Sequence, residues 1–153
     1  MKILILSDSH GDTAVTEKIV RRERPDHLLF LGDGLRDTEE LARIFPTLPI
    51  CGVKGNNDWM SDEETEKTIL LAGTRIFLCH GHTTGVRQTT DVQWLRARQK
   101  NCTVSLFGHT HSQYLEERDG ILLLNPGTAM RDLYAVLTLR PGEKPTAELK
   151  RDY

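Results

Sequence analysis

The sequence has few cysteines, no long apolar run and no excess of positive charge. Its three cysteines, Cys51, Cys79 and Cys102, lie far apart, so no thiolate cluster indicates a structural zinc ion. We expect them to stay reduced and to pack as small hydrophobic residues in a cytoplasmic protein. No run approaches the roughly 20 apolar residues of a membrane-spanning helix. Met1 leads directly into an apolar run, so we expect no signal peptide.

Length, composition and charge restrict the class of protein further. A chain of 153 residues with 38% hydrophobic and 27% charged residues is typical of one folded domain, expected over residues 1–153. The formal net charge of -2 provides no electrostatic footprint for a nucleic-acid backbone. We therefore expect neither a membrane nor duplex nucleic acid as a partner.

Apolar runs alternate with helical patterns in the first part of the chain and with hairpins later. Runs at 3–6, 27–31 and 50–53 are separated by predicted helices at 13–24 and 37–45. This alternation favours parallel βαβ units. Strand pairs are predicted for 67–71 with 75–79, 113–118 with 121–124, and 133–139 with 147–150, with a helix at 91–100, a strand at 103–107 and a loop at 125–128.

Five of the apolar runs end in a cluster of Asp, Asn or His. These clusters are Asp8/His10, Asp33, Asn56/Asn57/Asp58, His80/His82 and His109/His111. Open α/β sheets bind ligands beyond the carboxyl ends of their strands, so the clusters are expected to converge. Taken alone, Asp8 and His10 fit a polar turn in which Asp8 caps the next helix. The recurrence, which uses five of the six histidines, favours a ligand site instead.

The convergent side chains have the chemistry of a transition-metal site. Imidazole and carboxylate groups suit Mn, Fe, Zn or Ni. Two carboxylates, an amide and several imidazoles exceed the needs of one cation. The sequence therefore predicts two metals that share an aspartate.

The order of these motifs resembles the calcineurin-like metallophosphoesterase family. The residues that carry the resemblance are Asp8-Ser9-His10, Gly32-Asp33, Gly55-Asn56-Asn57-Asp58, His80-Gly81-His82 and Gly108-His109-Thr110-His111. The short chain and its Asn125-Pro126-Gly127-Thr128 segment resemble the small bacterial and archaeal phosphodiesterase branch, which also contains the retromer subunit Vps29. The resemblance implies an α/β fold, a four-layer α-β-β-α sandwich of two packed mixed β-sheets.

The resemblance also implies a ligand set for two divalent cations. Asp8, His10 and His111 match the ligands of the first metal; Asn56, His80 and His109 match those of the second; and Asp33 matches the bridging carboxylate. Manganese is the expected metal, with nickel, zinc or iron as alternatives. A hydroxide held between the metals would attack phosphorus in line, which makes a small-molecule phosphodiester the expected substrate.

Three further residues are candidates for a part in catalysis. Asn57 stands where larger phosphatases of the family have a histidine; it can donate a hydrogen bond to phosphate but no proton to the leaving group. Asp58 either orients a loop or an imidazole, or only forms an Asx turn. His82 either lines the pocket or supports a ligand.

Other assignments stay open at the level of the sequence. The alternative to an enzyme is a non-catalytic, Vps29-like metal-binding scaffold for protein interactions, and a homodimer is compatible with the resemblance. Trp59 and Trp94 are expected to pack in the core or an interface, with substrate stacking as the less favoured interpretation. Arg87 is expected to be a solvated loop residue, with a phosphate contact as the alternative.

Overall fold

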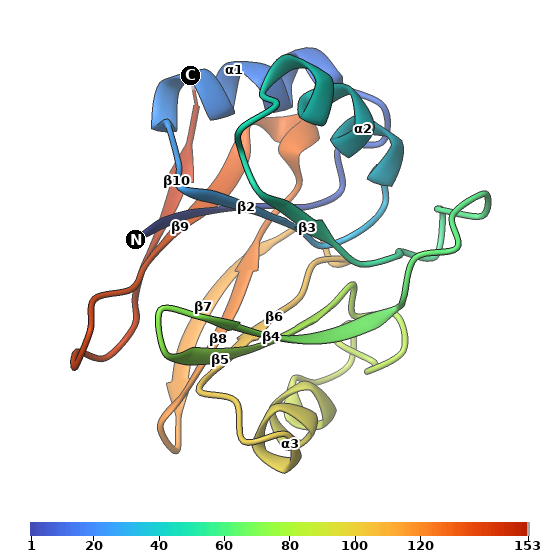
Figure 1. Cartoon of the computed structure of the whole chain (residues 1–153). Helices are drawn as coiled ribbons and strands as arrows, with labels where there is room; N and C mark the ends of the chain where they lie inside the picture. Colours follow the sequence, from blue (N-terminus) through green and yellow to red (C-terminus); the bar gives the residue numbers. More distant parts are fainter. Residues whose placement is uncertain (153) are drawn as a thin grey trace.

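Two five-stranded sheets form the centre of the molecule (Figure 1). The computed structural model describes residues 1–152, so Tyr153, the last residue of the expected domain, lies outside the described residues. The first sheet has the order β10 (Thr146–Arg151), β9 (Leu133–Thr138), β1 (Lys2–Leu6), β2 (His27–Phe30), β3 (Ile50–Gly52). The second has the order β4 (Glu66–Leu71), β5 (Thr74–Cys79), β6 (Val104–Leu106), β8 (Ile121–Pro126), β7 (Gln113–Arg118).

Both sheets are mixed, and helices cover their outer faces. β1 pairs in parallel with β2 and antiparallel with β9, and β6 pairs in parallel with both β5 and β8. Helices α1 (Thr13–Glu23) and α2 (Leu35–Ile44) lie on the first sheet, and α3 (Asp91–Gln99) lies on the second (Figure 1). A short 3-10 helix, η1 (Ala129–Arg131), precedes β9. The predicted four-layer sandwich of two packed mixed sheets is confirmed.

The core follows from the alternation of side chains along the strands. Ile3 and Ile5 of β1 point toward the second sheet and join Leu106 in the layer between the sheets. Leu4 points the other way and packs with Ile19 of α1. Burial on both faces explains why β1 is a continuous apolar run. This placement holds the end of β1 firmly at the edge where the two sheets meet.

Predicted and observed ends of helices and strands differ by one or two residues. Asp12 caps α1, its Oδ1 accepting a hydrogen bond from the N–H of Val15 at 3.2 Å. The predicted loop at 125–128 begins inside a strand, because Asn125 and Pro126 pair with β7 and extend β8. None of the helices in the described residues has the length and apolarity needed to cross a bilayer.

Candidate metal centre

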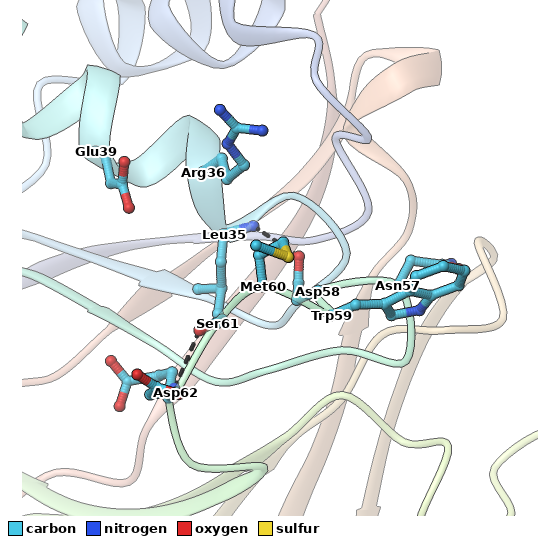
Figure 2. Close-up of a pocket in the computed structure, with 10 residues that line it drawn as sticks. Leu35, Arg36, Glu39, Asn57, Asp58, Trp59, Met60, Ser61 and Asp62 are labelled. Atoms are coloured by element: carbon cyan, nitrogen blue, oxygen red, sulfur yellow. Dashed lines mark hydrogen bonds between the residues drawn. The ribbon is translucent and has the colours of Figure 1, made fainter.

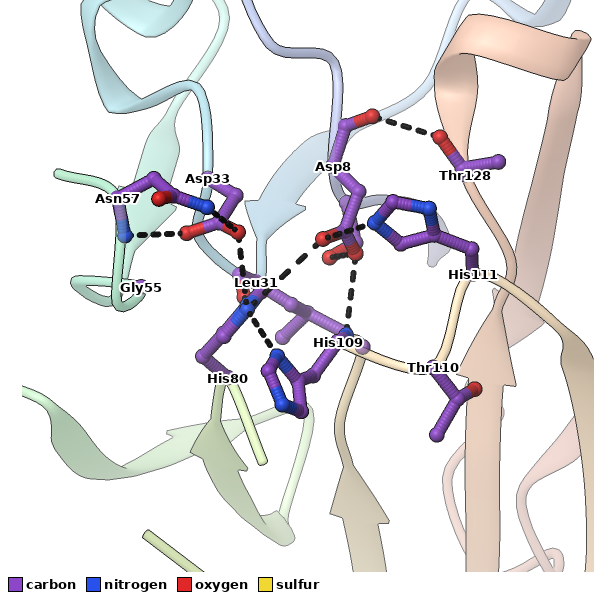
Figure 3. A network of polar contacts seen from close by, with 12 residues as sticks. Asp8, Leu31, Asp33, Gly55, Asn57, His80, His109, Thr110, His111 and Thr128 are labelled. Atoms are coloured by element: carbon purple, nitrogen blue, oxygen red, sulfur yellow. Dashed lines mark hydrogen bonds and ion pairs between the residues drawn. The ribbon is translucent and has the colours of Figure 1, made fainter. Parts of the chain in front are cut away.

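The carboxyl ends of five strands bring most of the predicted ligands to one edge of the sandwich. The loops after β1, β2, β3, β5 and β6 meet there, and Figure 3 shows Asp8, Asp33, Asn57, His80, His109 and His111 directed toward a common centre. Backbone hydrogen bonds join neighbouring loops: the N–H of Asp8 donates to Gly32 O at 3.0 Å, and that of Gly108 to His80 O at 2.8 Å. The predicted convergence is thus present in the structure.

Asp8 is buried and held by several hydrogen bonds. Its side chain is completely buried, and its Oδ2 accepts hydrogen bonds from Ser7 Oγ at 2.5 Å and from the N–H of His109 at 3.1 Å. Its backbone carbonyl accepts a hydrogen bond from Thr128 Oγ1 at 2.7 Å. These contacts fix the orientation of the carboxylate before any ligand binds.

The second carboxylate oxygen of Asp8 faces only imidazoles. Oδ1 has no hydrogen-bond donor among the described residues, although it is buried. The Nε2 atoms of His111, His10 and His80 lie 3.2, 3.7 and 3.8 Å from it. A buried carboxylate oxygen without a donor is costly, and a cation bound between it and the imidazoles would remove that cost.

Asp33 lies between the two predicted ligand sets. Its Oδ2 is 3.3 Å from His80 Nε2 and 3.9 Å from His10 Nε2. Asn57 donates to it twice, from its backbone N–H to Oδ1 at 2.9 Å and from Nδ2 to Oδ2 at 2.8 Å. Burial raises the pKa of this carboxyl, but the hydrogen bonds from His80 and Asn57 outweigh burial and hold the pKa well below its usual value. Asp33 is therefore an anion at neutral pH.

Two imidazoles have surroundings that suit metal ligands. Nδ1 of His80 lies 2.6 Å from the carbonyl oxygen of Leu31, a contact that assigns the proton to Nδ1 and leaves Nε2 free to ligate. Burial lowers the pKa of His80, but the carboxylates of Asp33 and Asp8 outweigh burial and hold the pKa above its usual value. Burial and the charge of His80 lower the pKa of His109 to about 4, so its imidazole is neutral at pH 7.

The backbone is strained at five of the seven predicted ligand positions. Asp8, His10, Asp33, His109 and His111 all have positive φ angles, between 46° and 68°. Residues other than glycine rarely adopt this conformation, and clusters of it mark functional sites. The loops also pass close together: a Cβ atom at Gly32 would lie 2.7 Å from the nitrogen of Gly55 and 2.9 Å from His80 Nδ1.

The remaining predicted site residues are placed less uniformly. Asn56 is exposed, and it is the side chain of the next residue, Asn57, that contacts Asp33. The ring centroid of His82 lies 5.5 Å from that of His80, and its Nδ1 is buried without a hydrogen-bond partner among the described residues. Burial and the charge of His80 lower the pKa of His82. Asp58 accepts hydrogen bonds from backbone N–H groups after β2, so it orients a loop.

The residues with open assignments also differ from one another. Trp94 is half-buried against the apolar cluster under α3, as expected for packing. Trp59 is 79% exposed, so its expected packing in the core was wrong; its Nε1 instead donates to the carbonyl of Asn56 at 2.7 Å. Arg87 is exposed, as expected, and its charge is among the influences that lower the pKa of His109.

Several supporting residues were missed by the sequence analysis. The buried Asn125 donates from Nδ2 to Gly108 O at 3.0 Å and accepts at Oδ1 from the N–H of Gly127 at 2.9 Å, which fixes the loop that carries His109. Asp37 of α2 accepts hydrogen bonds from Ser9 Oγ and, at 3.1 Å, from the N–H of Gly11. The one feature of the sequence that points to these residues is a polar side chain inside or beside an apolar pattern.

The donors fit divalent cations in composition and spacing. Two groups have their ligand atoms within 4.8 Å of one another, Asp8/His10/His111 and Asp8/Asp33/His80. Carboxylate oxygens together with imidazole nitrogens suit Mn, Fe, Zn and Ni. Asp8 belongs to both groups, whereas the resemblance assigned the shared position to Asp33. The unpartnered Oδ1 of Asp8 and the Oδ2 of Asp33 both face this cluster of imidazoles.

Comparison with known proteins agrees with this geometry. Residues 1–142 match the family model of the calcineurin-like phosphoesterase superfamily domain. The probable metallophosphoesterase YsnB of Bacillus subtilis is 34% identical over 148 residues, covering 91% of this chain and 85% of that protein. The phosphodiesterase YfcE of Escherichia coli is 28% identical over 152 residues, covering 84% and 79%.

Solved structures support the same fold. Wild-type Vps29 of Entamoeba histolytica, solved in complex with Zn²⁺, superposes with a TM-score of 0.77 at 22% identity over 99% of both chains. This likeness concerns the fold alone. With the family model matched over almost the whole length and a relative above 30% identity, the chain belongs to the calcineurin-like phosphoesterase superfamily.

Proposed function

We propose that this protein is a metal-dependent phosphodiesterase with a centre for two divalent cations. The observation that carries the proposal is Oδ1 of Asp8, a buried carboxylate oxygen without a donor that lies within 3.8 Å of three imidazole nitrogens. A structural polar cluster would pair this oxygen with a donor, because an unsatisfied buried acceptor destabilises the fold.

The proposed ligands fall into two sets with a carboxylate between them. Asp8, His10 and His111 hold one cation, and Asn56, His80 and His109 hold the other, with Asp33 between them. When bound, such a metal pair supplies a water of lowered pKa as nucleophile and positive charge for the phosphate. We propose Mn²⁺ as the metal because oxygen and imidazole ligands suit it. For Asn56, the exposed side chain must turn inward from its position in this structure.

The protein itself supplies orientation and hydrogen-bond donors. Ser7 and the N–H of His109 orient Asp8, and the carbonyl of Leu31 orients His80, so the ligand atoms are held in place beforehand. Asn57 and His82 are the proposed donors to the phosphoryl oxygens. Asn57 is an amide, so it stabilises charge but transfers no proton to a leaving group.

A diester is favoured over a monoester by the relatives. YfcE, which is similar over most of its length, is named a phosphodiesterase. The net charge of -2 argues against a long, highly charged duplex as substrate. The proposed substrate class is therefore a small phosphodiester.

The deciding experiment is hydrolysis of a chromogenic aryl phosphodiester after the metal has been removed and restored. Protein stripped with a chelator is reloaded with Mn²⁺, Ni²⁺ or Zn²⁺ in turn, and the matching monoester is assayed in parallel. We expect activity to disappear on stripping, to return with metal, and to favour the diester. Asp8→Asn is the inactive control, and Asp91→Asn, an exposed position on α3, is the unaffected control.

Two outcomes would contradict the proposal. Activity that survives complete removal of metal would exclude the metal centre as its source. Tight binding of metal without turnover of either ester would favour the Vps29-like scaffold, in which the same residues hold ions and the surface binds another protein.

A further inference from the structure

A pocket of about 660 Å³ opens beside the candidate metal centre. It lies between the start of α2 and the loop that follows Asn57, and we call it the Trp59 pocket (Figure 2). The residues that matter here are Leu35, Arg36, Glu39, Asn57, Trp59 and Asp62. Asn57 belongs to both sites, because its amide also donates to Asp33. The pocket therefore shares a residue with the candidate centre and lies next to it.

Trp59 is exposed, and a hydrogen bond ties its indole to the backbone. Its side chain is 79% exposed, and the neighbouring Met60 is 91% exposed. Single exposed apolar residues are common on protein surfaces, so exposure alone indicates nothing. Here the indole Nε1 donates to the carbonyl of Asn56 at 2.7 Å, which anchors the ring to the loop of the candidate centre. Figure 2 shows the indole beside Asn57 rather than folded onto the core.

We propose that the Trp59 pocket receives the leaving group of the substrate and that the indole of Trp59 stacks on a planar aromatic ring in that group. The inference rests on the proposed phosphodiesterase function and names its substrate class. An anchored, exposed indole offers a flat apolar face, and aromatic rings, nucleobases included, stack on such faces. The fixed ring loses little conformational freedom on binding.

The charges around the pocket restrict the ring further. Glu39 and Asp62 are exposed acidic residues that line the pocket, and Arg36 is the cation among the lining residues. Carboxylates repel a second phosphate but accept hydrogen bonds from amino groups and ring N–H groups. The leaving group is therefore a neutral aromatic with donors at its edge, chemistry that a nucleoside provides. Leu35 supplies an apolar contact at the start of α2.

The test distinguishes the effect of stacking on the rate of hydrolysis from the effect of the acidity of the leaving group. Two methyl phosphodiesters are compared, one with a phenyl and one with a fluorinated alkyl leaving group, whose alcohols have the same acidity. We expect Trp59→Ala to lower kcat/KM for the phenyl diester about tenfold and to change that for the alkyl diester less than about twofold. Trp59→Phe keeps an aromatic face and is expected to retain most of the preference. Leu70→Ala, at a 64% exposed position on β4, is the matched control.

Binding provides a readout that does not depend on turnover. In Trp94→Phe protein, Trp59 is the only tryptophan, so indole fluorescence reports on the pocket. Phenyl phosphate and adenosine monophosphate should quench this fluorescence saturably, and methyl phosphate and inorganic phosphate should not. Quenching that is the same for all four probes, or absent for all four, would overturn the proposal.

The remaining outcomes distinguish the pocket from the function. If wild-type protein hydrolyses both diesters and Trp59→Ala keeps their ratio, the subsite is wrong while the phosphodiesterase stands. If wild-type protein hydrolyses neither, the proposed function fails, and the quenching measurement alone decides on the subsite. If Trp59→Phe lowers kcat/KM for the phenyl diester as much as Trp59→Ala does, the indole acts by holding Asn56. If Trp59→Ala changes the molecular mass in light scattering and leaves the ratio of kcat/KM for the two diesters unchanged, the loop is an interface between copies. Both results overturn stacking.

Discussion

The backbone N–H of Asp33 donates a hydrogen bond to Oδ2 of Asp58 at 2.7 Å. The side chain of Asp58, in the loop after β3, therefore holds the backbone of Asp33, in the loop after β2. The carboxylate of Asp58 also accepts from the N–H groups of Gly34, Leu35 and Gly55 at 2.8 to 3.1 Å. Gly34 is the N-cap of α2 and has no side chain to cap the helix, so Asp58 performs that task from another loop. Asp58 is a positioning residue for Asp33.

Replacement of Asp58 tests this role. Asp58→Asn keeps the shape of the side chain but leaves one acceptor oxygen for four N–H groups. We expect metal affinity to fall about 10- to 100-fold and the free energy of unfolding to fall by about 1–3 kcal/mol. Calorimetric titration with Mn²⁺ and urea unfolding measure the two effects. Asp91→Asn, which loses only a surface contact with Arg118, should change neither, and an Asp58→Asn protein with native metal affinity would refute the assignment.

The metal content of two variants decides whether Asp33 or Asp8 is the carboxylate shared by the two cations. The resemblance assigns the bridge to Asp33, whereas Asp8 is the member common to both groups of close donors. Loss of a bridging carboxylate should abolish activity and reduce the metal stoichiometry together, because both cations depend on it. We expect this result for Asp33→Asn, measured by elemental analysis after dialysis. Full metal content in Asp33→Asn together with depletion in Asp8→Asn would transfer the bridge to Asp8.

Stability at low pH depends on a cluster far from the candidate site. Glu23 of α1 lies 2.6 Å from Nζ of both Lys2 and Lys150 and accepts a hydrogen bond from Tyr134 at 2.7 Å. Burial raises the pKa of Glu23, but the contacts with Lys150, Lys2 and Tyr134 outweigh it and lower the pKa from 4.5 to about 2. The ionised form therefore stabilises the fold above pH 4.5, and this contribution is lost as the pH falls from 4.5 to 2.

We accordingly expect Glu23→Gln to lower the free energy of unfolding by about 2 kcal/mol at pH 7. The difference from the wild-type protein should shrink through the same interval and be small near pH 2. Urea unfolding at a series of pH values measures it. A difference that stays constant with pH would show that Glu23 acts through packing and not through its charge.

The sequence predicted the layers well because their signals are local. The run at 3–6 is apolar at every position, which burial on both faces explains. The two residues between the predicted strands at 113–118 and 121–124, Asp119 and Gly120, form a turn in which both φ angles are positive. The end of β8 was not predictable in this way. Asn125 and Pro126 read as a loop, and only pairing with β7 makes them part of the strand.

The same distinction holds for the candidate site. The ends of the apolar runs identified Asp8, Asp33 and His80 because strand ends in such sheets converge. The supports of the site, such as Asn125 on Gly108, act across distances that no local pattern contains. Trp59 was expected to pack in the core or an interface, since apolarity is a local property. It is exposed instead, and its indole donates a hydrogen bond to the carbonyl of Asn56, three residues earlier in the chain.

The last prediction concerns the missing proton donor. Asn57 is exposed and donates to Asp33, and it has no proton to give to a leaving group. The wild-type protein should therefore cleave aryl diesters much better than alkyl diesters, which need protonation. Asn57→His should reduce this aryl-to-alkyl ratio at least about tenfold, and the gain for alkyl esters should vanish above the histidine pKa, near 6.5. Asn57→Ala loses the same contact with Asp33 without adding a proton donor, so its ratio should stay at the wild-type value. A histidine variant with the alanine variant's ratio would mean that position 57 does not reach the leaving group.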